Sequence, residues 1–448
     1  MGCHYSIIDN ELYVNGRKYR HDIIDRVSFS PQYVKVVTMC IHVSTKCNLK
    51  CRYCFRKENN NESININDIK RFIDCVLQVY PRADRYNVDM SGDAEPLLNP
   101  NLVFSIAQYC KQLSDRLNRS VIPLLVTNGT LLSENIVHKL QDAGILFGIS
   151  LDGDIVSHDK NRVFPDGRGS FNLIKQNISN INNKKYVGAA ITYSGGDLLN
   201  DFLVAFDLLP TVSIKPTRFT NEDFDVDLIC KGYKRLIEFI LIKTLENKTD
   251  YLFSLINGDD YFGKFLKRIV LRSAVYGRCD AGIGRFSLAS DKKIYFCPPA
   301  VGIPDGCLGD LDNGIPYKEI VNMWGRQQNS LCSKCFAYSA CGGECKIVSY
   351  NLYGNFDNID NKMCYIKRYL FALAVCFITV LRQKDVTLYK WLKKAVQQID
   401  SYDALDIQLA EAVQKCQGEY SYTQLKYIKD NNSSLFDKIY TSLTNKKR

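Results

Sequence analysis

Six short apolar runs alternate with amphipathic segments between Lys35 and Lys215, and this alternation constrains the fold more than any other feature of the sequence. The apolar runs predict strands at residues 35–44, 86–91, 121–127, 145–151, 186–193 and 211–215. The segments between them predict helices at 66–80, 101–117, 134–143, 170–181 and 197–209. Strands that alternate with helices form parallel βα units, and nearly continuous apolar strands are typical of sheets covered on both faces. Six units are fewer than the eight of a closed barrel, so the sequence predicts an α/β protein built on an open, partial (β/α)6 barrel of the TIM type.

Three cysteines follow directly on the first predicted strand. Cys47, Cys51 and Cys54 are separated by three and then two residues. Functional residues of such barrels lie at the carboxyl ends of the strands, where these three stand. A structural zinc site usually takes four protein ligands, whereas three local thiolates suit an iron–sulfur cluster with one iron left for another ligand. The sequence therefore favours a cluster here, with three buried or zinc-binding cysteines as the alternative.

A second group of cysteines lies towards the C-terminus. The chain has 18 cysteines and 5 histidines, and from Cys332 to Cys345 the cysteine spacing is Cys-x2-Cys-x5-Cys-x3-Cys. Segment 279–364 shows little regular periodicity, so it cannot bury much apolar surface alone and metal ligation would stabilise it. Soft thiolates select iron–sulfur clusters or zinc, and a pair of zinc sites stays open as the alternative.

Polar residues also follow the next three predicted strands, in the segments Gly92-Asp93-Ala94-Glu95, Thr127-Asn128-Gly129 and Ser150-Leu151-Asp152. Glycine lets a backbone approach a ligand closely, and a carboxylate can bind an ammonium group. Each segment by itself is also consistent with a turn or a helix cap. Because they follow consecutive strands in order, together they predict one ligand site beside the cysteine triad.

These motifs resemble the radical S-adenosylmethionine (SAM) superfamily. In that family three cysteines with this spacing, with an aromatic residue before the last one, hold a [4Fe–4S] cluster whose fourth iron binds SAM. The resemblance implies SAM contacts from Asp93 or Glu95 to the amino group, with Glu95 favoured, from Ser150 to the ribose, and from Arg162 to the carboxylate, which suits a guanidinium fork. The full set of cofactor-binding candidates is Tyr53, Gly92, Asp93, Glu95, Thr127, Asn128, Ser150, Asp152 and Arg162.

The C-terminal cysteines closely resemble the SPASM domain, a seven-cysteine extension of certain radical SAM enzymes. The resemblance implies two auxiliary [4Fe–4S] clusters, and hence three clusters in all. One would be held by Cys332, Cys335, Cys341 and Cys364, and the other by Cys279, Cys297 and Cys345. Relatives that ligate the second cluster fully have a further cysteine where this chain has Arg285. We therefore expect that this cluster keeps an open iron or that Cys307 reaches it.

The chain divides into five predicted parts. They are a hairpin appendage with an Asn-Gly turn at 1–34, the radical SAM partial barrel at 35–220, a helical bridge at 221–278, the irregular cluster-binding SPASM domain at 279–365, and C-terminal helices at 366–448. The apolar run Tyr369–Leu381 is shorter than the roughly 20 residues that span a bilayer, so it predicts a buried helix. No secretory signal pattern opens the chain, and we expect a cytoplasmic protein with no membrane partner.

The resemblance implies a radical SAM oxidoreductase, which cleaves SAM to a 5′-deoxyadenosyl radical that abstracts a hydrogen atom from a substrate. SPASM enzymes mostly act on peptides, so we expect a maturase that forms a side-chain cross-link (carbon–carbon, ether or thioether) in a ribosomally made (RiPP) precursor. A cyclophane or darobactin-like link is the narrower expectation. The alternatives are an anaerobic sulfatase maturase that forms formylglycine, against which Arg285 counts, and a non-enzymatic iron–sulfur redox sensor.

The expected partners follow from this reaction. They are a precursor peptide with its leader and an external one-electron reductant, flavodoxin or ferredoxin. The net charge of +10 arises in large part from the C-terminal segment. No basic block there is interleaved with aromatic residues, so we expect a solvated surface or a leader-binding surface and no nucleic-acid partner.

Overall fold

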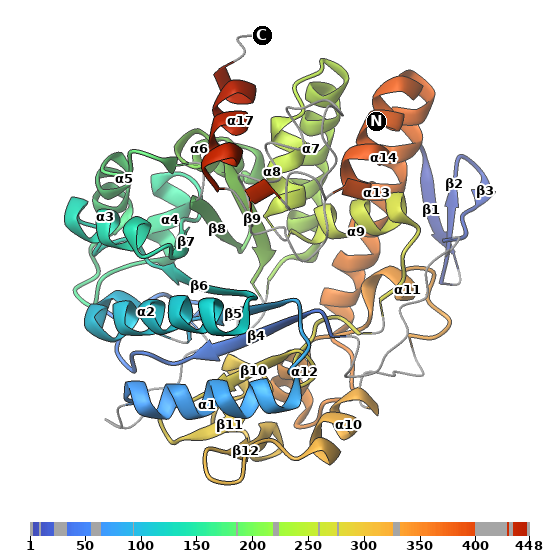
Figure 1. Cartoon of the computed structure of the whole chain (residues 1–448). Coiled ribbons are helices and arrows are strands. Elements are labelled where there is room, and N and C mark those ends of the chain that lie inside the picture. The colour runs from blue at the N-terminus through green and yellow to red at the C-terminus, as the bar shows by residue number, and fades with distance from the viewer. Residues whose placement is uncertain are drawn as a thin grey trace.

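A nine-stranded sheet forms the centre of the molecule, in the order β12-β11-β10-β4-β5-β6-β7-β8-β9. The structure, a computed structural model, describes residues 3–8, 10–21, 34–54, 64–92, 94–184, 187–217, 224–258, 260–275, 277–325, 332–398, 428–429 and 433–445. Figure 1 shows this sheet crossing the molecule, with helices α1 to α6 along its outer side.

Six of the strands form the predicted parallel array. They are β4 (Val36–Ile41), β5 (Arg85–Asp89), β6 (Ser120–Thr127), β7 (Leu146–Ser150), β8 (Val187–Tyr193) and β9 (Thr211–Pro216). Each pairs in parallel with the next one along the chain. The predicted α/β partial barrel is therefore confirmed, and all six carboxyl ends meet at one edge.

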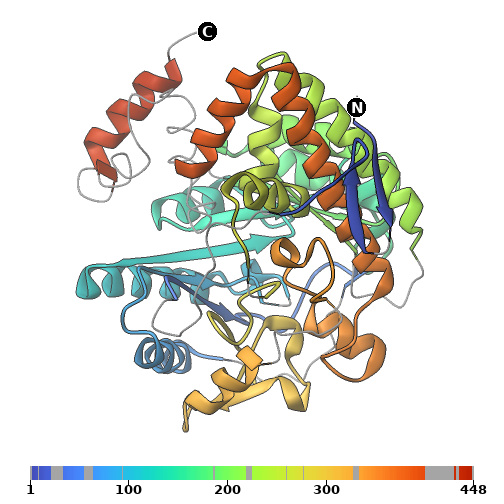
Figure 2. The same ribbon diagram turned by 90° about the vertical axis from the view of Figure 1, so that its right-hand side faces the viewer.

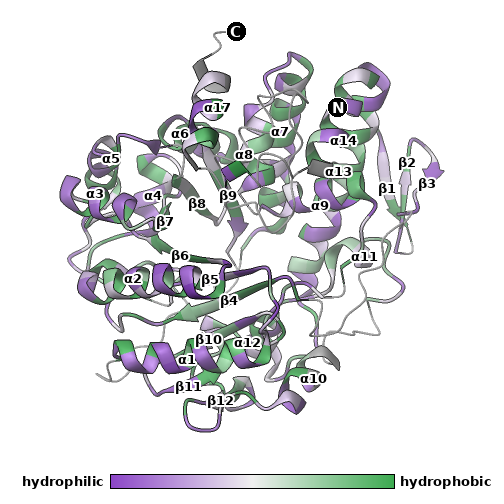
Figure 3. Cartoon of the chain, in the orientation of Figure 1, coloured by the Kyte–Doolittle hydropathy of each residue, from purple (hydrophilic) through white to green (hydrophobic). Residues whose placement is uncertain are grey.

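Helices connect these strands close to the predicted positions. They are α1 (Ile66–Val79), α2 (Pro100–Leu117), α3 (Glu134–Asp142), α4 (Ile155–Asn161), α5 (Phe171–Ser179) and α6 (Leu198–Leu208), with a short 3-10 turn η2 (Pro96–Leu98) before α2. The sequence did not predict α4, which has 7 residues and begins because Asp154 accepts a hydrogen bond from the Ser157 backbone nitrogen. Helix α1 buries Ile69, Phe72 and Val76. Because these apolar residues repeat with the helical period, the sequence predicted this helix. In Figure 3 β4 and β6 are mainly hydrophobic, whereas α1 and α2 carry both kinds of residue.

The cysteine-rich segment is more regular than the sequence indicated, because it adds three strands to the sheet. They are β10 (Arg285–Leu288), β11 (Lys293–Tyr295) and β12 (Cys307–Asp310). Strand β10 pairs in parallel with β4, with Phe286 beside Met39. Strands of three or four residues are too short to show a period in the sequence. Pairing with β4 stabilises β10, and β11 and β12 pair in turn with β10 and β11. The segment is thereby attached to the strand that leads into the cysteine triad.

The remaining helices lie before, within and after this segment in the chain. They are α7 (Val226–Leu245), α8 (Asp250–Asn257), α9 (Tyr261–Leu271), α10 (Tyr317–Gly325), α11 (Tyr338–Cys341), α12 (Lys346–Tyr353), α13 (Asn361–Lys384), α14 (Val386–Gln398) and α17 (Ser433–Asn445), with 3-10 turns η4 (Pro298–Ala300) and η5 (Pro304–Gly306). The boundary predicted at 365/366 falls inside α13. This helix begins earlier because Asp360 accepts hydrogen bonds from the backbone nitrogens of Lys362 and Met363.

Helix α13 is the buried helix expected from the apolar run Tyr369–Leu381. It packs against α7 and α9. Among the described residues it is the one helix whose length and composition would allow it to cross a membrane, and 72% of its apolar window is buried inside the protein.

The N-terminal residues form a small sheet of β1 (Tyr5–Ile8), β2 (Glu11–Val14) and β3 (Arg17–Lys18). The predicted Asn-Gly turn joins β2 to β3, and both of its residues have a positive φ, 50° at Asn15 and 75° at Gly16. The sheet lies beside α13 (Figure 2). There the ring of Tyr5 meets that of Tyr369 edge-on with centroids 6.0 Å apart.

Candidate active site and thiol clusters

The loop that carries Cys47, Cys51 and Cys54 leaves β4 and is held against the ends of other strands. The backbone nitrogens of Lys50 and Arg52 donate to the carbonyls of Val163 and Asn161, at 2.8 and 2.9 Å. The Glu95 backbone nitrogen donates to the carbonyl of Lys46 at 3.1 Å. The segments after β5 and α4 therefore fix the path of this loop.

Polar side chains after β6 fix the start of the same loop. Asn128 donates through Nδ2 to Oδ1 of Asn48 at 2.8 Å, and Asn48 donates through its own Nδ2 to Oγ1 of Thr130 at 2.8 Å. The Asn128 amide also lies 3.9 Å from the sulfur of Cys47. Asn128, predicted to line the cofactor site, thus contacts the triad loop directly.

The three thiols are close enough to influence one another. Burial raises the pKa of Cys51 to about 11; Arg162 opposes this rise, and Cys54 and Cys47 add to it. Burial also raises the pKa of Cys47, whereas Cys54 is exposed. Iron ligation requires thiolates. The positive charge of the bound iron would therefore have to offset the free-energy cost of burying the negative thiolates.

Asp152, just beyond β7, is the most connected carboxylate of the site. It accepts hydrogen bonds from Arg162 Nε at 2.9 Å and Nη2 at 3.2 Å, from the Thr192 backbone nitrogen at 2.8 Å, and from the Tyr53 hydroxyl. The Arg162 guanidinium also lies 5.2 Å from the centre of the Tyr53 ring. Tyr53 belongs to the triad loop, so Asp152 joins that loop to the ends of β7 and β8.

Arg162, the predicted contact for the SAM carboxylate, therefore also binds Asp152 and lies over the ring of Tyr53. Burial alone would lower its pKa, but the Asp152 carboxylate outweighs this and the pKa of Arg162 is raised. The guanidinium stays charged and held in one orientation. The contact with SAM stays a prediction, and Asp152 is placed to position Arg162 by the two-point pair.

His158, on α4, holds the backbone of Asp152 through a hydrogen bond. Its Nδ1 accepts from the Asp152 backbone nitrogen at 3.2 Å, and its Nε2 lies 3.0 Å from the Ser170 hydroxyl. Burial, and to a lesser extent the charge of Arg162, lowers the pKa of His158 to about 4. The ring is therefore neutral at pH 7. The sequence analysis did not single out this residue, because a histidine inside a short helix carries no local signal of such a role.

Glu95, favoured from the sequence for the SAM amino group, turns towards the protein. Its Oε1 accepts from the Leu97 backbone nitrogen at 3.0 Å and from the Thr127 hydroxyl at 2.7 Å, and its Oε2 accepts from the Asn128 backbone nitrogen at 2.7 Å. Burial raises the pKa of Glu95, and these three donors oppose the rise. Three of about four acceptor positions on the carboxylate are thus used to join the ends of β5 and β6.

Gly92 is the position of this segment where no larger residue fits. It has φ +46°, and a Cβ there would lie 3.0 Å from the His42 Cα and 3.2 Å from the Ile41 carbonyl oxygen. Asp93 lies outside the described residues. Ser150 is half-buried at the end of β7, where it pairs with Ala190. The roles predicted for Asp93 and Ser150 stay predictions.

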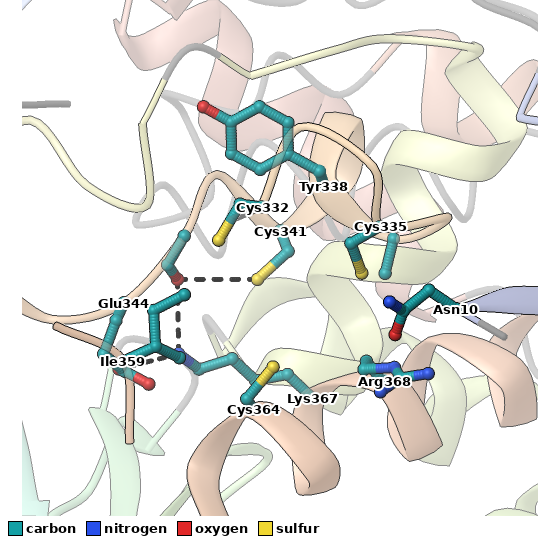
Figure 4. A pocket seen from close by; sticks show the side chains of 12 residues that line it. Asn10, Cys332, Cys335, Tyr338, Cys341, Glu344, Ile359, Cys364, Lys367 and Arg368 are labelled. Atoms are coloured by element: carbon teal, nitrogen blue, oxygen red, sulfur yellow. Dashed lines mark hydrogen bonds and ion pairs between the residues drawn. The ribbon is translucent and has the colours of Figure 1, made fainter. Parts of the chain in front are cut away.

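Four cysteines of the C-terminal group surround one cavity. Cys332, Cys335, Cys341 and Cys364 line a space of about 80 Å³, and Figure 4 shows their sulfur atoms around it. Cys341 closes α11 and Cys364 stands in the first turn of α13, while Cys332 and Cys335 come from the loop before α11. The predicted ligand set is therefore brought together from segments up to 32 residues apart, from Cys332 to Cys364.

The other three cysteines also lie near one another. Burial raises the pKa of Cys297 well above its usual range, and the charges of Cys345 and Cys279 add to the rise. The thiol of Cys307, predicted as a possible further ligand, donates to the Gly309 carbonyl at 3.4 Å, and its role as a ligand stays a prediction.

Arg285 stands on β10, where relatives of the SPASM class have an extra cysteine. Its Nε lies 3.1 Å from Asp280 Oδ1, and its Nη1 lies 4.0 Å from Asp89 and 3.5 Å from the sulfur of Cys40. Cys40 on β4 also raises the pKa of Cys297 slightly, after the larger effects of burial and of the other two thiols. The sequence analysis did not assign Cys40 a role, because only the β4–β10 pairing brings it here.

These donor sets fit iron–sulfur clusters better than single ions. Among the residues that the structure describes, no three cysteine, histidine or acidic side chains are arranged to hold one metal ion. Thiolates on a single zinc ion would stand about 3.8 Å apart, as a tetrahedron with 2.3 Å bonds requires. A cluster binds each thiolate through a different iron and so takes a wider ring of sulfur atoms. The four-cysteine cavity offers the four thiols that such a cluster requires.

Comparisons with known proteins agree with this arrangement. Residues 41–209 match the family model of the radical SAM superfamily. The chain is 31% identical over 375 residues to a cysteine-type anaerobic sulfatase-maturating enzyme of Clostridium novyi (strain NT), covering 74% of this chain and 93% of that enzyme. It is 23% identical over 402 residues to the radical SAM cyclopropyl synthase TigE of Paramaledivibacter caminithermalis, covering 83% of this chain and 79% of that protein.

A solved structure shows the same fold. Native anSMEcpe with bound AdoMet and Cp18Cys peptide superposes with a TM-score of 0.64 at 20% identity, covering 78% of this chain and 99% of that one. The triad after β4, the polar strand ends beside it and these similarities lead to one assignment: this chain belongs to the radical SAM superfamily of enzymes, which bind SAM and a [4Fe–4S] cluster.

Proposed function

We propose that this enzyme is a peptide maturase of the SPASM class, which forms a cross-link between side chains of a ribosomally made precursor peptide. The observation that carries the proposal is the pair of thiol sites in one chain. A triad of cysteines lies at the carboxyl edge of the barrel, and a cavity with four cysteine side chains lies in the C-terminal segment. A second redox site supports an oxidation, because bond formation after hydrogen abstraction leaves one electron to be accepted.

Bound SAM and the triad cluster would supply the 5′-deoxyadenosyl radical. The proposed task of the chain's own residues is to hold the cofactor and orient the peptide. Cys47, Cys51 and Cys54 ligate the triad cluster. Arg162, held by Asp152 and by the ring of Tyr53, presents a fixed positive charge to the SAM carboxylate.

In the C-terminal segment, Cys332, Cys335, Cys341 and Cys364 hold one auxiliary [4Fe–4S] cluster. The second is held by Cys279, Cys297 and Cys345, and the Arg285 guanidinium lies where relatives have a further thiolate. An iron that is not ligated by cysteine could bind the peptide directly. The similarity to a cyclopropyl synthase, which extends over 83% of this chain, supports bond formation in the substrate.

Formylglycine formation is the second candidate. It is favoured by the 31% identity to a cysteine-type anaerobic sulfatase-maturating enzyme. Arg285 weighs against it, since such enzymes are expected to ligate both auxiliary clusters fully. For either reaction we propose a cytoplasmic enzyme that takes electrons from flavodoxin or ferredoxin and acts on a peptide or protein.

The experiment is anaerobic co-expression of the enzyme with each short open reading frame beside its gene, followed by tandem mass spectrometry of the peptide. Loss of two hydrogen atoms, with no fragmentation between two linked residues, is expected. Conversion of one cysteine or serine to an aldehyde would favour formylglycine formation.

Two controls make this result specific. Cys51→Ala should abolish the modification, because SAM cleavage depends on the triad cluster. Cys110→Ala removes a buried cysteine of α2 that lies outside every predicted ligand set, and it should leave the modification intact. A modified peptide from the Cys51→Ala enzyme would contradict the proposal.

A further inference from the structure

Two neighbouring cations on α13 face the four-cysteine cavity. Lys367 and Arg368 follow Cys364 by one helical turn, and both line the cavity (Figure 4). The charge of Lys367 lowers the pKa of Cys332, against larger effects from burial and from the other thiols. The charges of Lys367 and Arg368 also lower the pKa of Cys364, against larger effects of burial and of its neighbouring thiols. The cavity is thus electropositive on its α13 side.

Lys367 is already neutralised within the protein. Its Nζ lies 2.7 Å from Glu344 Oε1, and it donates to the Gly343 carbonyl at 3.2 Å. Both side chains are almost fully buried, with 3% and 4% of their surface exposed. Burial alone would lower the pKa of Lys367, and Glu344 reverses this, so the pair is held as two charges. Its net charge towards the cavity is close to zero.

Arg368 differs from Lys367 because it has no such partner. Among the described residues no carboxylate forms an ion pair with its guanidinium, and its Nε is buried without a hydrogen-bond acceptor. The guanidinium is held in place by the ring of Phe336, whose centre lies 5.3 Å away. Its charge lowers the pKa of Cys335, against the larger effect of burial. A buried N–H without an acceptor is costly, and an acceptor bound in the cavity that Arg368 lines would remove this cost.

We propose that Arg368 is a positioning residue for the auxiliary cluster at this cavity and sets its reduction potential. Its guanidinium places a positive charge beside the four negative thiolates. Its Nε–H donates to a sulfur atom of the bound cluster. Charge and hydrogen bonds to sulfur are two of the main determinants of cluster potential. Both favour the reduced cluster, which carries one more negative charge. Arg368 therefore raises the reduction potential of this cluster and makes it a better electron acceptor than it would be without the arginine.

The proposal rests on the cluster assigned under the proposed function, but not on the peptide reaction. The test is an anaerobic redox titration followed by electron paramagnetic resonance, without SAM or peptide. The full chain is used with Cys51→Ala and Cys297→Ala, so that the four-cysteine site dominates the signal.

In Arg368→Leu we expect the equilibrium constant for one-electron reduction to fall at least tenfold, which corresponds to about 59 mV. Arg368→Lys keeps the charge and lacks the Nε hydrogen, so a smaller fall is expected. Arg382→Leu removes an arginine of the same helix about 21 Å further along its axis and should leave the potential unchanged.

Equal potentials in the parent, Arg368→Leu and Arg368→Lys proteins, at equal iron content, would overturn the proposal. Should Arg368→Leu fail to bind iron, Arg368→Gln and Arg368→Lys carry the same comparison, with the lower potential expected for glutamine. An unmodified peptide together with the expected shift would contradict the peptide reaction alone. No iron bound at Cys332, Cys335, Cys341 and Cys364 would contradict both.

Discussion

Asp152 and Arg162 form a two-point ion pair in the interior of the protein, with Nε and Nη2 at 2.9 and 3.2 Å from the two carboxylate oxygens. Only 3% of the Asp152 side chain and 9% of the Arg162 side chain are exposed. The pair joins the end of β7 to the segment after α4, and through Tyr53 it reaches the cysteine triad. Its integrity should therefore affect both stability and the triad loop.

Asp152→Asn should lower the free energy of unfolding by about 3–5 kcal/mol, because it leaves a buried guanidinium without its carboxylate. Tyr53→Phe removes only one hydrogen bond to the same carboxylate and should cost about 1 kcal/mol. Urea denaturation of the two variants and the parent protein measures both values. Similar losses in the two variants would show that the pair is not the main contribution.

Glu95→Gln distinguishes a role inside the protein from contact with SAM. The variant places an amide N–H₂ among three donors, so it should cost about 1–3 kcal/mol of unfolding free energy. If Glu95 serves only to join β5 to β6, the SAM dissociation constant of the loaded enzyme should change less than threefold. Isothermal titration under anaerobic conditions measures this constant. A rise of more than tenfold would support Glu95 as the contact for the amino group.

Cys341→Ser should remove about four iron atoms per chain, because it takes one of four thiolates from the C-terminal cavity. SAM cleavage without peptide should persist, since the triad is intact. Iron analysis and assay of 5′-deoxyadenosine measure the two effects. Cys230→Ser, a buried cysteine of α7 outside the predicted ligand sets, is the control and should keep its full iron content.

The pH dependence of stability should contain a contribution from His158. Its pKa in the folded protein is about 4, below the ordinary value of 6.5, because burial disfavours the charged ring. The unfolded chain therefore binds more protons between pH 4 and 6.5. The contribution of His158 is fully present above pH 6.5 and is lost as the pH falls towards 4, with a total of about 3 kcal/mol.

The measurement compares the parent protein with His158→Gln at pH 7 and pH 4.5, because Asp201 titrates in the same range with the opposite sign. Burial raises the pKa of Asp201 to about 6, so its protonation stabilises the folded state as the pH falls. The difference between the two proteins cancels this contribution. A difference in unfolding free energy that is the same at both pH values would contradict the assignment of a neutral, buried His158.

Local patterns in the sequence determined the barrel and the thiol sites. The apolar runs predicted all six parallel strands, since each strand buries at least every second residue and helix faces repeat with a period of 3.6 residues. The turn at Asn15-Gly16 followed from the left-handed backbone that these residues tolerate. The resemblance of the C-terminal cysteines to the SPASM domain implied which four thiols belong together, and the thiols at positions 332, 335, 341 and 364 do line one cavity.

Tertiary structure alone decided how the polar groups are used. Glu95 turns to Thr127 and Asn128, and Arg162 pairs with Asp152, because each buried charge takes the donors or acceptors that folding brings near it. The pairing of β10 with β4 and the position of Arg368 at the cavity depend in the same way on residues distant in the chain. Periodicity describes which face of an element is buried, but the partner of a buried charge is set by three-dimensional contact, and no local pattern encodes it.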